Sequence, residues 1–166
     1  MKKLLLSIVV LVFAVSVNAQ KGTFSAGINL GLPTADASDA YSFTLGAEVN
    51  YMFDVSEEFK AGVAVSYSSY FGKDITFLGT TVEIENAAML PIAGAVRYLA
   101  SEKFSIGADL GYAIGISPDG NDGGFYYRPI VGYNISEKIE LNASYSGVSV
   151  EGGTIANFGL GLMFKL

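Results

Sequence analysis

The sequence predicts an all-β protein: an eight-stranded antiparallel up-and-down transmembrane β-barrel, preceded by a cleavable signal peptide. Three observations predict this fold class. Apolar residues alternate with small polar ones along most of the chain after residue 20, which is the period of a strand with two unlike faces. Aromatic residues gather at the ends of the alternating runs. No apolar stretch after residue 20 could cross a membrane as a helix, so a chain that crosses one must do so as a closed barrel.

Residues 41–71 show the alternation most clearly, as two runs joined by a short turn at residues 54–58. Tyr41 and Phe43 open the first run, and Tyr51 and Phe53 close it, which is the placement of the two aromatic girdles of a membrane barrel. A tilted strand of this length spans roughly 20 to 30 Å, which matches the apolar band of such a barrel. The segment is therefore predicted to be a transmembrane β-hairpin.

The two faces of these strands differ in a way that orients them. The polar face carries mainly Gly, Ser, Ala, Asn and Thr, whereas a face in contact with water would carry many Lys and Glu. Small side chains fit a crowded barrel interior, so the aliphatic face is expected to contact lipid. The alternative is a soluble, lipocalin-like barrel that carries an apolar ligand inside.

Residues 1–19 have the three regions of a secretory signal. Lys2 and Lys3 supply the charge, residues 4–17 form an apolar run, and Ala19 ends a segment of small residues. The apolar run is shorter than a membrane-spanning helix needs, which makes an anchor the less favoured reading. Cleavage after Ala19 is expected, and residues 20–166 are then the barrel domain.

Composition excludes several classes of function. The chain has a net charge of −6, and loss of residues 1–19 would leave eight basic residues against 16 acidic ones, which argues against binding to nucleic acid. It has no Cys and no His, which argues against disulfides and against His or Cys metal sites. Most general bases and nucleophilic triads rely on His, so we expect no catalytic residues, no cofactor and no enzymatic activity.

Taken in order, the chain offers about eight strands. They are expected at residues 24–32, 41–53, 59–71, 89–98, 104–115, 125–133, 139–145 and 156–166. Loops are expected at residues 33–40, 117–124 and 146–154, and a hairpin is expected to project beyond the membrane around Gly79. Pro91 cannot donate a ladder hydrogen bond, so it predicts a bulge or weakened pairing in the fourth strand.

A repeated plan marks three tight turns at one end of the barrel. Residues 53–59, 98–104 and 133–139 each begin with an aromatic residue, continue with Ser-Glu and a charged residue, and end with a large apolar residue. Short turns of outer-membrane barrels face the periplasm. The glycine-rich and aspartate-rich loops at the other end are therefore expected to face outside.

Six charged residues fall in the inward phase of the strands, three basic and three acidic. Counting from the turns predicts two levels of opposite charges, and Asp109 is expected to pair with Arg128, with Glu48 as a rival partner. A desolvated charge is costly when it is alone, so these residues predict an ion-pair network that fills the lumen. The alternative is that they line a conducting path. The six residues are Glu48, Lys60, Arg97, Asp109, Arg128 and Glu140.

With these features, residues 21–166 resemble the small bacterial outer-membrane β-barrels, the eight-stranded family that includes OmpX-like proteins and the barrel half of OmpA. The resemblance implies location in the cell outer membrane. It also implies that the last strand carries the signal that the barrel-insertion machinery recognises. The usual last residue of that signal is Phe, whereas this chain ends in Leu. The matching residues are Phe158, Leu160, Leu162, Phe164 and Leu166.

The first functional hypothesis is therefore an integral outer-membrane protein with a structural or surface-interaction role. Its partners would be outer-membrane lipid, the insertion machinery during assembly and an extracellular partner reached through the loops, without nucleic acid. The second hypothesis is a narrow, porin-like passage for ions or small solutes. The third is the soluble carrier of an apolar ligand.

Overall fold

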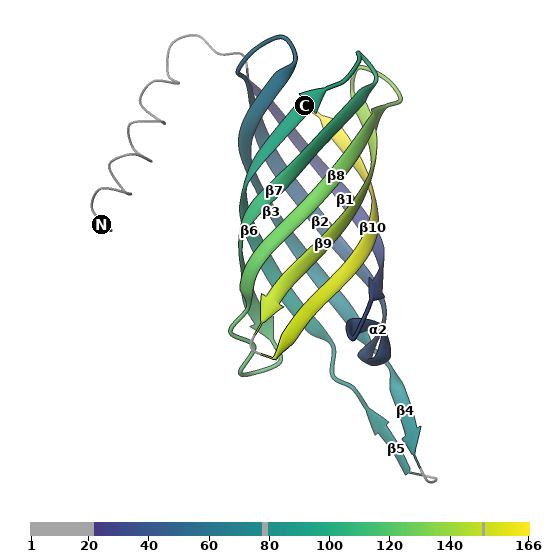
Figure 1. Ribbon diagram of the computed structural model, residues 1–166. Helices are drawn as coiled ribbons and strands as arrows, with labels where there is room; N and C mark the ends of the chain where they lie inside the picture. Colours follow the sequence, from purple (N-terminus) through teal and green to yellow (C-terminus); the bar gives the residue numbers. More distant parts are fainter. Residues whose placement is uncertain (1–21, 78–79, 151) are drawn as a thin grey trace, which may run out of the picture.

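The computed structural model describes residues 22–77, 80–150 and 152–166 of the chain. The expected signal peptide at residues 1–19 and the hairpin tip at Gly79 lie outside the described residues. Within the described part, no helix is long and apolar enough to cross a membrane. The strands close into a single antiparallel barrel, with a short two-stranded hairpin beyond one end (Figure 1).

The barrel is a ring of eight strands in the order β1-β10-β9-β8-β7-β6-β3-β2, which confirms the predicted class. Each barrel strand therefore pairs with the barrel strands that precede and follow it along the chain. The first strand, β1, pairs with the last, β10, to close the ring. The strands are β1 (Gly22–Thr34), β2 (Tyr41–Asp54), β3 (Phe59–Gly72), β6 (Ala87–Leu99), β7 (Phe104–Ser117), β8 (Gly124–Asn134), β9 (Ile139–Val150) and β10 (Gly153–Lys165).

Side chains alternate between the outside of the ring and the lumen, because successive residues of a strand point to opposite faces. On β2 the apolar Leu45 and Val49 are exposed on the outside, while Thr44 and Glu48 are buried inside. The other strands follow the same rule, so large apolar side chains cover the exterior. Exposure of so many large apolar side chains is expected only of a surface that contacts lipid.

The three turns predicted from the repeat are built alike. The hydroxyl of Ser56 accepts a hydrogen bond from the backbone N–H of Phe59 at 3.1 Å. Ser101 and Ser136 do the same for the residues three positions later, also at 3.1 Å. The last residue lies at this end as well, where the Leu166 N–H donates to the Phe24 carbonyl at 2.9 Å. We call this end of the barrel the turn end.

The opposite end, which we call the loop end, contains more structure than the sequence predicted. A short helix, α2 (Ala37–Ala40), lies in the segment expected to be a plain loop. The hairpin of β4 (Asp74–Phe77) and β5 (Thr80–Glu83) extends beyond the barrel (Figure 1). The prediction of a loop at residues 146–154 is wrong, because β9 continues to Val150 and β10 begins at Gly153.

Two prolines interrupt the ladders. Pairing of β3 with β6 stops at Val65 with Ile92 and resumes at Ser68 with Met89, which leaves out Pro91. Pro129 lies in the corresponding gap between β8 and β9. A proline lacks the N–H that a ladder needs, so the weakened pairing expected at Pro91 is found.

Candidate functional site: the barrel interior

The lumen is divided into three regions along the barrel. An apolar plug of seven buried residues lies toward the loop end, a charge network lies in the middle, and a polar cavity lies toward the turn end. The plug consists of Tyr70, Ala87, Met89, Ala93, Ala113, Tyr126 and Val148. The charge network consists of Glu48, Arg97, Asp109 and Arg128.

The centre of the charge network is the pair of Asp109 and Arg128. These residues lie directly opposite each other on β7 and β8, both pointing into the lumen. The Asp109 carboxylate is fully buried, and it accepts from Nε of Arg128 at 2.8 Å and from Nη2 at 2.5 Å. Both bonds converge on Oδ2, so the guanidinium is held in orientation as well as neutralised in charge.

Arg97 reaches the same carboxylate from the neighbouring strand. Its Nη1 lies 2.5 Å from Oδ1 of Asp109 and also donates to the Val96 carbonyl at 2.9 Å. In the register Arg97 stands opposite Gly107, and a Cβ atom at residue 107 would lie 2.5 Å from Cδ of Arg97. The glycine therefore leaves the space through which the arginine side chain passes toward Asp109.

Glu48 connects the network to the opposite wall of the lumen. Its strand, β2, stands four places from β8 in the eight-stranded ring, so the two strands face each other across the barrel. Arg128 nevertheless forms an ion pair with Glu48 through Nη1, and Asn50 donates to the other carboxylate oxygen at 3.1 Å. Both partners considered for Arg128 thus contact it at once, and the Arg128–Glu48 pair spans the middle of the lumen.

The network is balanced in charge, with two arginines against two carboxylates. All four side chains are buried, so each charge has lost most of its hydration. Burial of this kind is tolerated only where the ions compensate one another and share hydrogen bonds.

The other two inward charges, Lys60 and Glu140, do not join the network. Lys60 instead forms an ion pair with Asp54 at 2.6 Å, because the register places Asp54 directly opposite it. Glu140 forms no ion pair within the described residues. The sequence predicts that Lys60, Arg97 and Glu140 form the level of opposite charges nearer the turns. This prediction is wrong, because Arg97 pairs with Asp109 and Lys60 pairs with Asp54.

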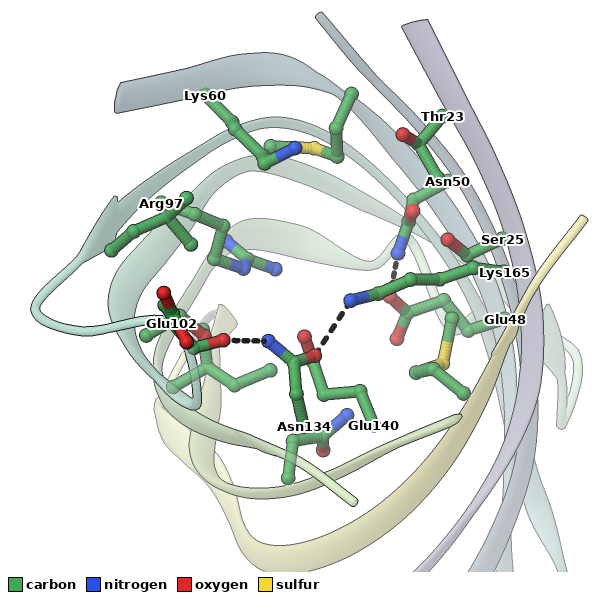
Figure 2. Close-up of a pocket in the computed structure, with 16 residues that line it drawn as sticks. Thr23, Ser25, Glu48, Asn50, Lys60, Arg97, Glu102, Asn134, Glu140 and Lys165 are labelled. Atoms are coloured by element: carbon green, nitrogen blue, oxygen red, sulfur yellow. Dashed lines mark hydrogen bonds between the residues drawn. The ribbon is translucent and has the colours of Figure 1, made fainter. Parts of the chain in front are cut away.

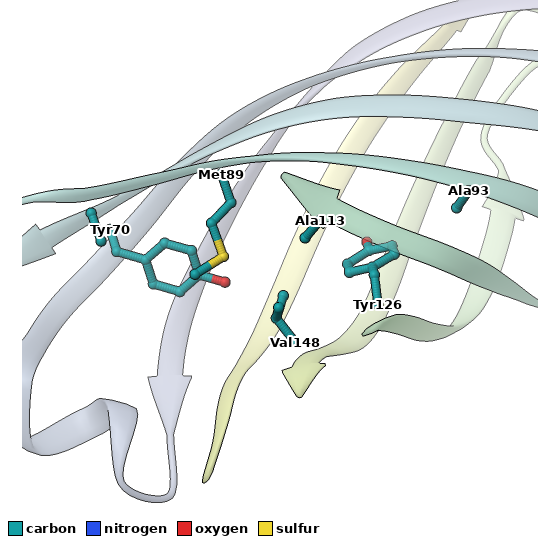
Figure 3. Close-up of a cluster of buried hydrophobic side chains, with 7 residues drawn as sticks. Tyr70, Met89, Ala93, Ala113, Tyr126 and Val148 are labelled. Carbon is teal, nitrogen blue, oxygen red and sulfur yellow. The ribbon is translucent and has the colours of Figure 1, made fainter. Parts of the chain in front are cut away.

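The apolar plug was not foreseen from the sequence. Tyr70, Met89, Tyr126 and Val148 are at most 5% exposed and lie inside the ring of strands (Figure 3). Tyr126 is two residues from Arg128 on β8, one inward step nearer the loop end, so the plug covers the network on that side. The signal was present in the sequence as large apolar residues in the inward phase, where the other positions are small.

Between the network and the turn end lies a polar cavity of about 200 Å³ (Figure 2). Glu48 and Arg97 line it on the network side. At the turn end Lys165 donates to Oδ1 of Asn134 at 2.6 Å, and Asn134 donates to the Glu102 carbonyl at 3.1 Å. In the part of the chain that the structure describes, no group of three side chains could hold a metal ion.

The residues of the expected assembly signal lie on β10 and at the chain end. Phe158, Leu160, Phe164 and Leu166 are exposed on the outer face, and Leu162 lies in the same phase, half-buried. This strand also pairs with β1 along its length, so it forms the closing seam of the barrel.

Comparison with known proteins agrees with this geometry. Ail, the attachment invasion locus protein of Yersinia pestis, matches with a TM-score of 0.57 at 15% identity, over 87% of this chain and 97% of Ail. A de novo designed transmembrane β-barrel matches with a TM-score of 0.55 at 14% identity, over 89% of this chain and 98% of the design. Neisserial surface protein A matches with a TM-score of 0.51 at 12% identity, over 90% of this chain and all of that protein (100%).

At such identities the three structures share the fold alone with this chain. A search of curated proteins found no match. The model of the family described as outer membrane protein beta-barrel domain matches residues 5–165, nearly the whole chain. This protein therefore belongs to the outer membrane protein β-barrel domain family and is a protein of the outer membrane.

Proposed function

We propose that the barrel is a closed anchor, and that the loop end is the part of the protein that a partner outside the cell contacts. The observation that carries this proposal is the obstruction of the lumen. Arg128 and Glu48 meet across its middle, and the apolar plug covers the loop side. An eight-stranded barrel is only wide enough for its own side chains, so these residues leave no continuous path for ions.

The orientation follows the general rule for such barrels, in which short turns face the periplasm and long loops face outside. The β4–β5 hairpin, helix α2 and the loop after β7 would then stand on the cell surface. We expect the barrel to hold them there without taking part in transport.

The charge of the loop end bears on the kind of partner. Among the described residues at this end, seven exposed carboxylates stand against one lysine, Lys73, whose ammonium donates to the Ser38 carbonyl at 2.6 Å. Ail has been crystallised with the heparin analogue sucrose octasulfate, a polyanion. Repulsion between like charges disfavours such a ligand here, so the partner we propose presents a neutral or basic surface. The seven carboxylates are those of Asp36, Asp39, Asp74, Glu83, Glu85, Asp119 and Asp122.

Conductance in a planar lipid bilayer tests the closed barrel directly. The wild-type protein is expected to insert without producing stable unitary current steps. Steps that change when Glu48→Gln or Arg128→Gln is introduced, and that do not change with Leu45→Val, would contradict the proposal and favour the narrow passage. Leu45 is the matched control because it lies on the same strand as Glu48 but on the outer face.

Binding to charged beads tests the partner chemistry separately. Barrels in lipid nanodiscs should bind polylysine-coated beads and should not bind heparin-coated beads at low salt. Replacing Glu83 and Glu85 with Gln should weaken the binding, whereas replacing Glu57 and Glu58 at the turn end should weaken it less. Preference for heparin, or equal effects of the two pairs, would exclude an acidic contact surface at the loop end.

A further inference from the structure

The cavity at the turn end of the lumen has polar groups that the barrel itself leaves unused. One is Oδ1 of Asn142, which has no hydrogen-bond partner in the described part of the chain although Asn142 is only 3% exposed. Buried polar atoms are almost always paired, so an orphan acceptor on a residue that lines a cavity points to a donor from outside the chain. Asn142 lines this cavity from β9.

The space in front of this oxygen is kept open by a glycine. Gly161 stands opposite Asn142 in the pairing of β10 with β9. A Cβ atom at residue 161 would lie 2.5 Å from Oδ1 of Asn142 and 2.3 Å from Oδ1 of Asn29. Any larger residue would therefore fill the position that a donor group could occupy.

A free carboxylate lies beside the amide. Glu140 precedes Asn142 by two residues on β9, so both side chains point into the lumen and both line the cavity. Glu140 has neither an ion pair nor a hydrogen bond to another described residue, and the nearby Lys165, which lines the same cavity, donates instead to Asn134. A carboxylate and an amide oxygen on one wall form an acceptor pair suited to a primary ammonium group, which carries three donors.

The cavity is also lined by two cations besides Lys165, namely Lys60 and Arg97. Arg97 uses Nη1 for its contacts with Asp109, Val96 and Ala108, and its guanidinium lies at the cavity, with Lys60 on the same side (Figure 2). Lys60 shares its charge with Asp54, which is itself partly exposed. These two cations offer donors to a carboxylate on the side of the cavity away from Glu140.

We propose that the turn-end cavity binds a small zwitterionic solute of the amino-acid type. Its ammonium group contacts Glu140 and Asn142, and its carboxylate contacts Lys60 and Arg97. A volume of about 200 Å³ admits a molecule of this size and excludes large ones. Because the charge network and the plug lie on the loop side of the cavity, the solute enters and leaves at the turn end. The site adds a binding activity inside the anchor and does not depend on what the loops contact.

Binding is measured by NMR titration of the folded barrel in lipid nanodiscs. The probe is glycine, and methylammonium and acetate each carry one half of its charges. Glycine is expected to give saturable shifts at residues that line the cavity and to bind at least about tenfold more tightly than either half, equivalent to about 1.4 kcal/mol. No saturation with glycine, or equally tight binding of methylammonium alone, would overturn the proposal.

Variants locate the site. Glu140→Gln and Lys60→Gln should each weaken glycine binding about tenfold, and Asn142→Ala should weaken it severalfold. Ser146→Ala is the matched control, because Ser146 points into the lumen from the same strand but does not line the cavity, and its affinity should stay within twofold of wild type. Each variant is first checked by its mobility as a folded, unheated band on a gel. Unchanged glycine affinity in folded Glu140→Gln, or equal loss in Ser146→Ala, would also overturn the proposal.

Discussion

Asp109→Asn should destabilise the folded barrel strongly. The Asp109 carboxylate is fully buried and pairs with two arginines, so its neutralisation leaves Arg97 and Arg128 with Glu48 as the remaining counter-charge of the network. Removing one partner of a buried ion pair costs about 3 to 5 kcal/mol, and we expect the free energy of unfolding to fall by an amount in this range. Asp54→Asn provides the same chemical change in a partly exposed pair with Lys60 and should cost about 0 to 1 kcal/mol.

Two double variants test the origin of this cost. Asp109→Asn with Arg128→Gln restores charge balance in what remains of the network, whereas Asp109→Asn with Glu48→Gln leaves two arginines without a carboxylate. The first double variant should cost less than the sum of its single changes, and the second should cost more. Coupling energies between contacting residues are about 0.5 to 3 kcal/mol, so the difference is measurable.

The chain has no Trp, so its unfolding cannot be followed by tryptophan fluorescence. Urea unfolding from lipid vesicles can be followed by far-UV circular dichroism and by the fraction of protein that migrates as the folded band without heating. Single costs that add in both double variants would refute the reasoning. Additivity would mean that the four groups are independent and hydrated, as in a water-filled lumen.

Three further predictions test the faces, the assembly and the turns. Val63→Arg, on the outer face, should lower the unfolding free energy by about 2 to 4 kcal/mol in vesicles, whereas Ser66→Thr in the lumen should be mild; a neutral Val63→Arg would contradict the lipid contact. Phe164→Ala should reduce the folded protein recovered from outer membranes far more than Phe125→Ala, an outer-face aromatic at the loop end, and equal yields would remove the role of β10 in recognition. Ser136→Ala should cost about 0.5 to 1.5 kcal/mol in the same urea assay through its lost turn hydrogen bond, and an unchanged stability would contradict a role of this hydrogen bond.

The alternation of residues was enough to predict the barrel and the orientation of its faces within the membrane. It failed at the loop end for a physical reason. At residues 148–149 the apolar side chain, Val148, points inward and Ser149 is exposed. This is the reverse of the pattern in the part of β9 nearer the turn end. There the inside of the ring holds the plug, so an apolar phase no longer marks the lipid face, and the pattern predicts a loop where β9 continues.

The interior was predictable only in part. Asp109 and Arg128 could be matched because both lie in the inward phase of neighbouring strands at similar distances from their turns. The reach of Arg97 to Asp109 depends on the stagger between strands and on the space above Gly107. Neither the stagger nor this space can be predicted from the sequence of one strand alone. The orphan oxygen of Asn142 likewise depends on three strands meeting at Gly161.

The position of the charge network behind the plug has a consequence for how the protein responds to salt at the loop end. Mobile ions screen exposed charges over a Debye length of about 8 Å at physiological ionic strength, but only where water carries them. The carboxylates of the loop end are exposed, so their attraction for charged partners weakens as the salt concentration around that end rises. Arg128, Asp109 and Glu48 are shielded from the loop end by the plug, and Glu48 lines the polar cavity on the other side. Salt at the loop end can therefore change the attraction of this surface for partners, while the buried ion pairs of the lumen are screened much less.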